Sequence, residues 1–262
     1  MKRKPNPSPP RRHRIAADAA DPAPRHGLAR VLSKLGVCSR TQGEALVRAG
    51  RVCVDGRIVR DPEAPTNAQG ARISLDGTDI AAVEKVYVML NKPRGYVVTA
   101  SDERGRDTVY TLLQNGKFPW LAPVGRLDKA SEGLLLFTND SAWAARITAP
   151  ESHIEKTYHV QIDRLPDAAL LTALHAGVDD HGEVLAAKSA RELRRGEKNA
   201  WLEIVLDEGR NRQIRRILAA FDVGVLQLVR VSVGTLVLGD LAKGQWRVLA
   251  SAEVAALKQP TP

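Results

Sequence analysis

Residues 125–140, GRLDKASEGLLLFTND, combine a charged pair on a glycine-bearing loop with the pattern of a buried strand. Arg126 and Asp128 lie in the loop, and the apolar run 134–137 follows before a turn at Asn139. Such a run, bounded by turn-forming residues, is typical of a short buried strand. A carboxylate held on a loop at the mouth of this strand can act as a nucleophile or a general base. The alternative is a surface aspartate paired with a neighbouring arginine.

A second group of chemically useful side chains lies in residues 208–221, EGRNRQIRRILAAF. Its arginines are Arg210, Arg212, Arg215 and Arg216. If the whole segment is helical, its apolar side chains fall on one face, while Arg212, Arg215 and Arg216 line the opposite face. This many guanidinium groups favours a clamp for phosphate or carboxylate. An ordinary amphipathic surface helix would more often mix lysine with glutamate.

The elements that must position these groups are mostly strands. Residues 156–162 alternate, with Tyr158 and two aliphatic residues on one face, which predicts a half-buried strand. Further strands are predicted at residues 86–90, 96–99, 184–187 and 201–206, and short helices near 108–113, 141–147 and 170–174. Because strands outnumber helices and mostly follow one another, we expect an α+β fold with a mixed, mostly antiparallel sheet flanked by helices.

A separate module is predicted ahead of this sheet. Apolar residues at helical spacing over 28–35 predict one helix, and Ser39 to Gln42 reads as a capping box that begins a second. An Asp-Gly turn after residue 54 predicts a tight hairpin, and a second Asp-Gly turn at 76–77 predicts another. Two helices followed by hairpins make a compact unit.

Positive charge is concentrated near the amino terminus. The chain has a net charge of +9, of which residues 1–26 contribute +5 and residues 27–60 another +5, so the rest sums to −1. This asymmetry favours a polyanionic partner. In the module, the residues expected to contact such a partner are Arg30, Lys34, Arg40, Arg48 and Arg51, and the alternative is an ordinary solvated charged face. Residues 1–26, rich in proline and arginine, are predicted to be a disordered basic tail that either contacts nucleic acid or only aids solubility.

Several classes of protein are disfavoured by composition. The two cysteines, Cys38 and Cys53, form no disulfide framework and no metal-ligand spacing with the histidines. A reducing cytoplasm is therefore the expected location. No apolar run approaches the length of a membrane span, and the amino terminus lacks a signal-peptide core. A metal-dependent nucleic-acid hydrolase would need clustered carboxylates, which do not stand out.

Four strings carry a resemblance to a known family: MLNKPRGYVVT at 89–99, GRLDKASEGLLLFTND at 125–140, KTY at 156–158 and EGRNRQIRR at 208–216. In this order they resemble the pseudouridine synthases of ribosomal RNA. The resemblance spans about residues 27–250. It implies an αL-type RNA-binding domain at 27–84 and a pseudouridine synthase domain at 85–258.

The resemblance also implies roles for individual residues. Asp128 would be the catalytic residue, and Arg215 would pair with it. Tyr158 would stack on the flipped base and help to remove the C5 proton. Arg126 would either fill the gap left by that base or bind a phosphate, and Arg210 and Arg212 would contact RNA. The family uses no metal ion and no organic cofactor.

The target implied by the resemblance is a uridine in ribosomal RNA. The strings at 208–216 and 228–241 look closer to the enzymes of the large subunit, whose target lies in the peptidyl-transferase region of 23S RNA. The same reaction on 16S RNA of the small subunit is the first alternative, and a non-catalytic ribosome-assembly protein is the second. We expect a monomer that acts on ribosomal RNA or a pre-ribosomal particle, away from membranes.

Overall fold

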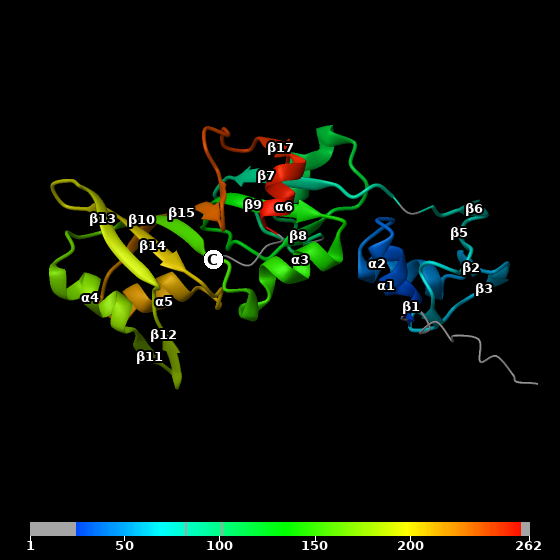
Figure 1. Cartoon of the computed structure of the whole chain (residues 1–262), viewed down its shortest axis with the longest axis horizontal. Helices are drawn as coiled ribbons and strands as arrows, with labels where there is room; N and C mark the ends of the chain where they lie inside the picture. The colour runs from blue at the N-terminus through cyan, green and yellow to red at the C-terminus, as the bar shows by residue number, and fades with distance from the viewer. Residues whose placement is uncertain (1–24, 82, 101, 258–262) are drawn as a thin grey trace, which may run out of the picture.

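The computed structural model describes residues 25–257, apart from Ala82 and Ser101 (Figure 1). The disordered tail expected over residues 1–26 therefore falls almost wholly outside the described residues. Figure 1 shows a small amino-terminal module at one end of an elongated molecule and a larger, sheet-based unit beside it. Among the described residues, no helix is both long enough and apolar enough to cross a bilayer.

The amino-terminal module packs two helices against small sheets. Its elements are β1 (His26–Gly27), α1 (Leu28–Lys34), α2 (Arg40–Arg48), β2 (Val52–Val54), β3 (Arg57–Ile58), β4 (Pro65–Thr66), β5 (Ile73–Leu75) and β6 (Thr78–Asp79). The strands form a four-stranded sheet in the order β3-β2-β5-β6 and a separate β1-β4 pair. Fully buried aliphatic side chains from both helices and from β2, such as Leu28, Val47 and Val52, form one core.

Local sequence explains how this module starts and turns. The Ser39 hydroxyl accepts a hydrogen bond from the Gln42 amide at 3.1 Å, and the Gln42 side chain accepts one from the Ser39 amide at 3.0 Å. These two bonds confirm the predicted capping box. Asp55 and Gly56 both have positive φ, +50° and +78°, as a type I′ hairpin turn requires. The predicted helices and the first hairpin are therefore confirmed.

The larger unit is built on one nine-stranded sheet. Its main path runs β13-β14-β10-β15-β9-β7-β17, with β8 on β9 and β16 on β15. These strands are β7 (Tyr87–Lys92), β8 (Ala122–Val124), β9 (Glu132–Thr138), β10 (Lys156–Ile162), β13 (Ser189–Arg195), β14 (Ala200–Leu206), β15 (Val225–Val233), β16 (Leu236–Val237) and β17 (Trp246–Val248). Among the described pairings in this sheet, only that of β15 with β9 is parallel. The predicted mixed, mostly antiparallel sheet is confirmed.

Strand β9 is the most deeply buried element, because the sheet is covered on both faces at this point. Leu134 and Leu136 pack with α3 (Ser141–Thr148) and α6 (Ser251–Ala256). Leu135 and Phe137 point to the other face, where the 3₁₀ helix η1 (Val109–Gly116) covers them. A second 3₁₀ helix, η2 (Pro150–Ser152), follows α3. The loop that carries Asp128 thus leads directly into a rigid strand.

The other half of the sheet has its own core. Strands β10 and β14 pack against α4 (Ala168–Ala176) and α5 (Gln213–Ala219). A short hairpin, β11 (Val178–Asp180) and β12 (Glu183–Leu185), lies beside α5. Two sequence predictions need correction here. Strand β13 was not predicted, and the helix expected over 208–221 spans only Gln213–Ala219.

Candidate active site

A cavity of about 520 Å³ opens in the larger unit, beside the loop that precedes β9. Its walls come from this loop, the start of β10, the ends of β14 and β15, and the segment that leads into α5. Predicted site residues that line it are Arg126, Asp128, Tyr158, Arg210, Arg212 and Arg215. Residues from three strings far apart in the sequence are therefore gathered around one space.

The carboxylate of Asp128 is half-buried at this cavity. Its side chain is 35% exposed, and Arg212 Nη1 lies 3.8 Å from its Oδ2. The loop is closed by a turn in which the Ser131 amide donates to the Asp128 carbonyl at 3.0 Å. Asp128 is therefore accessible from the cavity but held on a short, ordered loop.

Lys92 anchors this loop from beneath, a role that the sequence did not indicate. Its side chain is 0% exposed, and Nζ donates to the carbonyls of Pro93, Asp128 and Ser131 at 3.1, 3.2 and 2.7 Å. Burial lowers the pKa of Lys92 to about 8, although the nearby charges of Glu132 and Asp128 oppose the shift. A buried ammonium with three carbonyl partners fixes the backbone on either side of the Asp128 side chain.

Close approach of two strands fixes the other end of the loop. Gly133 of β9 pairs with Arg230 of β15, and its φ is +99°. A Cβ at this glycine would lie 2.2 Å from the Arg230 carbonyl oxygen. Only glycine therefore allows β15 to approach β9 closely enough to pair just after the Asp128 loop.

The arginine paired with Asp128 is not the one expected. Arg212 makes the ion pair, whereas Arg215 donates from Nη2 to the Ala130 carbonyl at 3.3 Å and from Nη1 to the Val225 carbonyl at 3.4 Å. Arg212 lies just ahead of α5 with a left-handed φ of +49°, so its side chain leaves the helical pattern. The expected pairing of Arg215 with Asp128 is therefore not the arrangement in this structure.

Arg215 is nevertheless part of the same electrostatic group. Burial is the main cause that lowers its pKa, the charges of Arg212 and Arg94 add to the shift, and Asp128 opposes it. Its buried Nε has no hydrogen-bond partner. The buried Nε is thus an unsatisfied donor in the wall of the cavity, which costs stability in this arrangement.

Tyr158 and Lys156 lie two residues apart on β10, so their side chains point to the same face of the sheet, and both line the cavity. Arg230, which is 6% exposed, pairs in register with Tyr158 and donates from Nε to the Leu134 carbonyl at 2.8 Å. The pKa of Lys156 is lowered by burial first and by the charge of Arg230 second, and Asp207 opposes the shift. The cavity therefore presents an aromatic ring among several cations.

Two of the four arginines near α5 are already neutralised by carboxylates of the protein. Arg216 binds Asp180, and its Nη2 contacts Glu183 at 2.7 Å. Arg210 contacts Glu183 at 3.0 Å and Glu208 at 2.8 Å. These pairs attach the β11-β12 hairpin to α5. The clamp predicted from four arginines is therefore reduced to Arg215 and to Arg212, which is only loosely paired with Asp128 at 3.8 Å.

The five basic residues predicted to bind RNA in the amino-terminal module lie on its helices and at the start of β2. Arg30, Arg40 and Arg48 are exposed. Arg51 is bound to Asp76, and the Lys34 ammonium lies 2.8 Å from the His26 ring. Arg126 is exposed at the cavity instead. The structure thus separates the predicted RNA contacts into two surfaces, one on each unit.

No group of three histidine, cysteine, aspartate or glutamate side chains within the described part of the chain is arranged to hold a metal ion. What the cavity does offer is a carboxylate, a tyrosine and several cations around a space of small-molecule size. Such a set can attack or deprotonate an anionic substrate that carries a planar ring.

Known proteins resemble this chain over most of its length. Residues 86–220 match the RNA pseudouridylate synthase family, and residues 27–65 match the S4 domain. An uncharacterised RNA pseudouridine synthase of Aquifex aeolicus is 35% identical over 228 residues, which is 86% of this chain and 91% of that protein. Ribosomal large subunit pseudouridine synthase B of Bacillus subtilis is 33% identical over 234 residues, 88% of this chain and 95% of that protein. A crystal structure of a pseudouridylate synthase aligns with a TM-score of 0.60 and 30% identity, covering 90% of this chain and 100% of the other.

Proposed function

Since this chain belongs to the RNA pseudouridylate synthase family, we propose that it isomerises one uridine of large-subunit ribosomal RNA and that Asp128 is its catalytic carboxylate. As a pseudouridine synthase it is an isomerase. The reaction breaks the bond between ribose C1′ and uracil N1, turns the base, joins C1′ to C5, and releases the C5 proton. The observation that carries the assignment is the position of Asp128, half-buried at a cavity lined by Tyr158 and several cations.

The cavity suits a uridine that has left its helix. Extruding a base costs a few kcal/mol, which contacts to its phosphates and to its ring must offset. Tyr158 offers a ring for stacking and a hydroxyl near the base, as expected for removal of the C5 proton. Arg126, Arg212 and Arg215 supply donors for phosphates, and we propose that the exposed Arg126 either binds a phosphate or fills the position that the base leaves in the RNA helix.

Asp128 can serve this reaction by either of two routes. It can attack C1′ or the base to form a covalent adduct, or it can remove a ribose proton to give a glycal. In both routes the carboxylate must be ionised and correctly directed. Arg212, 3.8 Å from the carboxylate, and the Lys92 anchor beneath the loop both help to direct the Asp128 side chain.

RNA binding and catalysis are assigned to different units of the protein. We propose that residues 27–84 bind ribosomal RNA, that residues 85–258 carry out the chemistry, and that the protein acts as a monomer in the cytoplasm on ribosomal RNA or a pre-ribosomal particle. The match of residues 27–65 to the S4 domain supports the first part, and the basic side chains exposed on α1 and α2 supply phosphate contacts.

The decisive experiment maps pseudouridine in ribosomal RNA by primer extension after carbodiimide treatment. Cells that lack the protein should lose one pseudouridine in 23S RNA, and the purified protein should restore it. Asp128→Asn, which preserves the shape of the side chain, should abolish restoration while RNA binding persists. A pseudouridine lost from 16S RNA instead would assign the small-subunit target. Normal turnover by the Asp128→Asn protein would reject Asp128 as the catalytic residue.

A further inference from the structure

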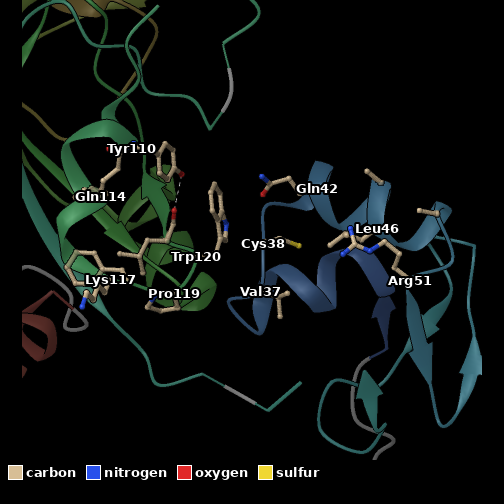
Figure 2. Close-up of a pocket in the computed structure, with 15 residues that line it drawn as sticks. Val37, Cys38, Gln42, Leu46, Arg51, Tyr110, Gln114, Lys117, Pro119 and Trp120 are labelled. Atoms are coloured by element: carbon tan, nitrogen blue, oxygen red, sulfur yellow. Dashed lines mark hydrogen bonds between the residues drawn. The ribbon is translucent and has the colours of Figure 1, made fainter. Parts of the chain in front are cut away.

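A second and larger cavity, of about 820 Å³, lies between the two units (Figure 2). One wall is the helical face of the amino-terminal module, with Cys38, Gln42 and Leu46. The other is the end of η1 and the segment after it, with Phe118 and Trp120. The walls meet where the Trp120 amide donates to the Gly36 carbonyl at 3.1 Å. The cleft is therefore tied at one edge and has walls from both units.

The side chain of Trp120 lines this cleft and packs against Tyr110, which is itself held in place. Its ring stacks on Tyr110, with centroids 5.0 Å apart and planes 12° from parallel. Tyr110 is held in turn by a hydrogen bond from its hydroxyl to the Leu121 carbonyl at 2.9 Å and by an edge contact with Phe137. In Figure 2 the Trp120 ring lies between Tyr110 and the side bearing Gln42 and Cys38. One face of the indole is covered by tyrosine, and the other is turned to the cavity.

The charges around the cleft favour an anionic occupant. Lys117 lines it, Arg51 also lines it but is already bound to Asp76, and no carboxylate among the described residues is part of its lining. The residues of α2 that face the cleft, Gln42, Ala45, Leu46 and Ala49, recur at helical spacing. By the same spacing Glu44, the acidic residue of α2, falls on the far side of the helix. An apolar slot with an aromatic platform and a cationic rim is how proteins hold single-stranded nucleotides.

We propose that this cleft binds one unpaired nucleotide of the RNA substrate, whose base stacks on the free face of Trp120. This second nucleotide is distinct from the target uridine, which enters the cavity at Asp128. Binding it would bridge the two units and fix the amino-terminal module relative to the catalytic cavity. The inference rests on the RNA substrate proposed above, and it adds a recognition site remote from the chemistry.

Cross-linking of the unmodified protein tests the contact directly. The probe is a transcript of the peptidyl-transferase region of 23S RNA in which some uridines are replaced by 5-iodouridine, which cross-links to aromatic rings on irradiation. Trypsin cleaves after Lys117 and Arg126, so Trp120 is released in the peptide 118–126. We expect that peptide to carry a nucleotide on Trp120. Cross-links elsewhere in the chain with none in this peptide would overturn the proposal.

Variants at Trp120 separate stacking from simple closure of the cleft. If a base stacks there, Trp120→Ala should weaken RNA binding about 5- to 150-fold, the range that loss of one aromatic platform causes. Trp120→Phe should recover most of the affinity, and Trp120→Leu should not. If the two apolar walls instead close on each other, Trp120→Leu should bind as well as Trp120→Phe, which would overturn the proposal.

Two controls keep this result separate from the proposed function. The salt dependence of binding should not change in Trp120→Ala, because stacking releases no counterions, whereas Lys117→Ala should make it shallower. Pseudouridine formation by the unmodified protein is measured on the same transcript. If it proceeds while the Trp120 variants bind normally, only the cleft proposal fails. If no pseudouridine forms on any ribosomal RNA, the proposed function fails instead.

Discussion

Replacing Lys92 with methionine tests whether its buried ammonium holds the Asp128 loop in place. The change keeps an unbranched side chain of similar size and removes the donor to the carbonyls of Pro93, Asp128 and Ser131. The Asp128 carbonyl keeps its hydrogen bond from the Ser131 amide. A buried acceptor that loses its partner costs about 1–3 kcal/mol, so the Pro93 and Ser131 carbonyls together cost about 2–6 kcal/mol. The native loop therefore depends strongly on this one group.

Part of that loss is regained, because methionine needs no charge in the interior. The pKa of Lys92 falls from 10.5 to about 8, and at about 1.36 kcal/mol per pKa unit this burial costs the native protein about 3 kcal/mol. Taking the middle of the range, about 4 kcal/mol, we expect the Lys92→Met protein to be less stable by about 1 kcal/mol. A loop that shifts by about 1 Å can lose about 100-fold in rate, so turnover should fall far more than RNA affinity.

The pH dependence of this difference has a definite sign. Between pH 8 and 10.5, the folded protein has lost the Lys92 proton while the unfolded chain still holds it. Stability therefore rises with pH over this window in the unmodified protein, and methionine removes the effect. The stability gap between the two proteins should widen from pH 8 to 10.5.

Urea unfolding at several pH values gives the stability gap, and release of tritium from RNA labelled at uridine C5 gives single-turnover rates. Lys188→Met, at an exposed lysine paired with Glu155, is the matched control and should leave both quantities almost unchanged. If Lys92→Met matched the unmodified protein in stability and in rate, the anchoring role of this ammonium would be refuted.

Two further predictions concern backbone approach and the arginine clamp. Gly133→Ala places a Cβ 2.2 Å from a backbone oxygen, so it should lower the free energy of unfolding by more than about 3 kcal/mol in urea titrations. The control is Gly105→Ala, which has open space around it. That change should cost only the strain of its positive φ, about 1–2 kcal/mol. Equal losses would show that β15 can move away from β9. Arg212→Ala should reduce the slope of log affinity against log salt concentration for RNA binding by about one unit. Arg216→Ala should leave this slope unchanged, because Arg216 is already bound to Asp180 and Glu183, and should instead lower the thermal midpoint of unfolding. Identical salt slopes for the two variants would place the phosphate contact elsewhere.

Elements with strong local signals were predictable from the sequence. The capping box of α2 and the Asp55-Gly56 turn depend on side chains within a few residues, and strand β10 has the expected bounds because its two faces differ in burial. Strand β13 was missed for the opposite reason. It is an edge strand rich in charged residues, with little of it buried, so no alternation marks it.

The site was predictable as a set of residues but not as a geometry. Residues 208–212, EGRNR, contain no apolar residue, so the amphipathic pattern does not fix where the helix begins. Nor does the sequence show that Arg212 has a left-handed φ and turns toward Asp128. Lys92 lies in the string NKPRG, which reads as an exposed turn, and its burial depends on strands that lie far away in the sequence. The cleft at Trp120 depends on how two units meet, which no local pattern encodes.

The order of the strands also bears on how the enzyme is made. Strand β9 follows the Asp128 loop, but its parallel partner β15 and the strand β17, which completes the sheet on β7, come near the end of the chain. On the ribosome, the loop therefore emerges long before the strands that enclose it. Pairing between such distant segments is slow, and until then the edge of β9 is open to other chains. The cavity beside Asp128 has lining residues up to Val233 on β15, so it can form only after that strand has left the ribosome. A shorter nascent chain carries the Asp128 loop without the walls that enclose it.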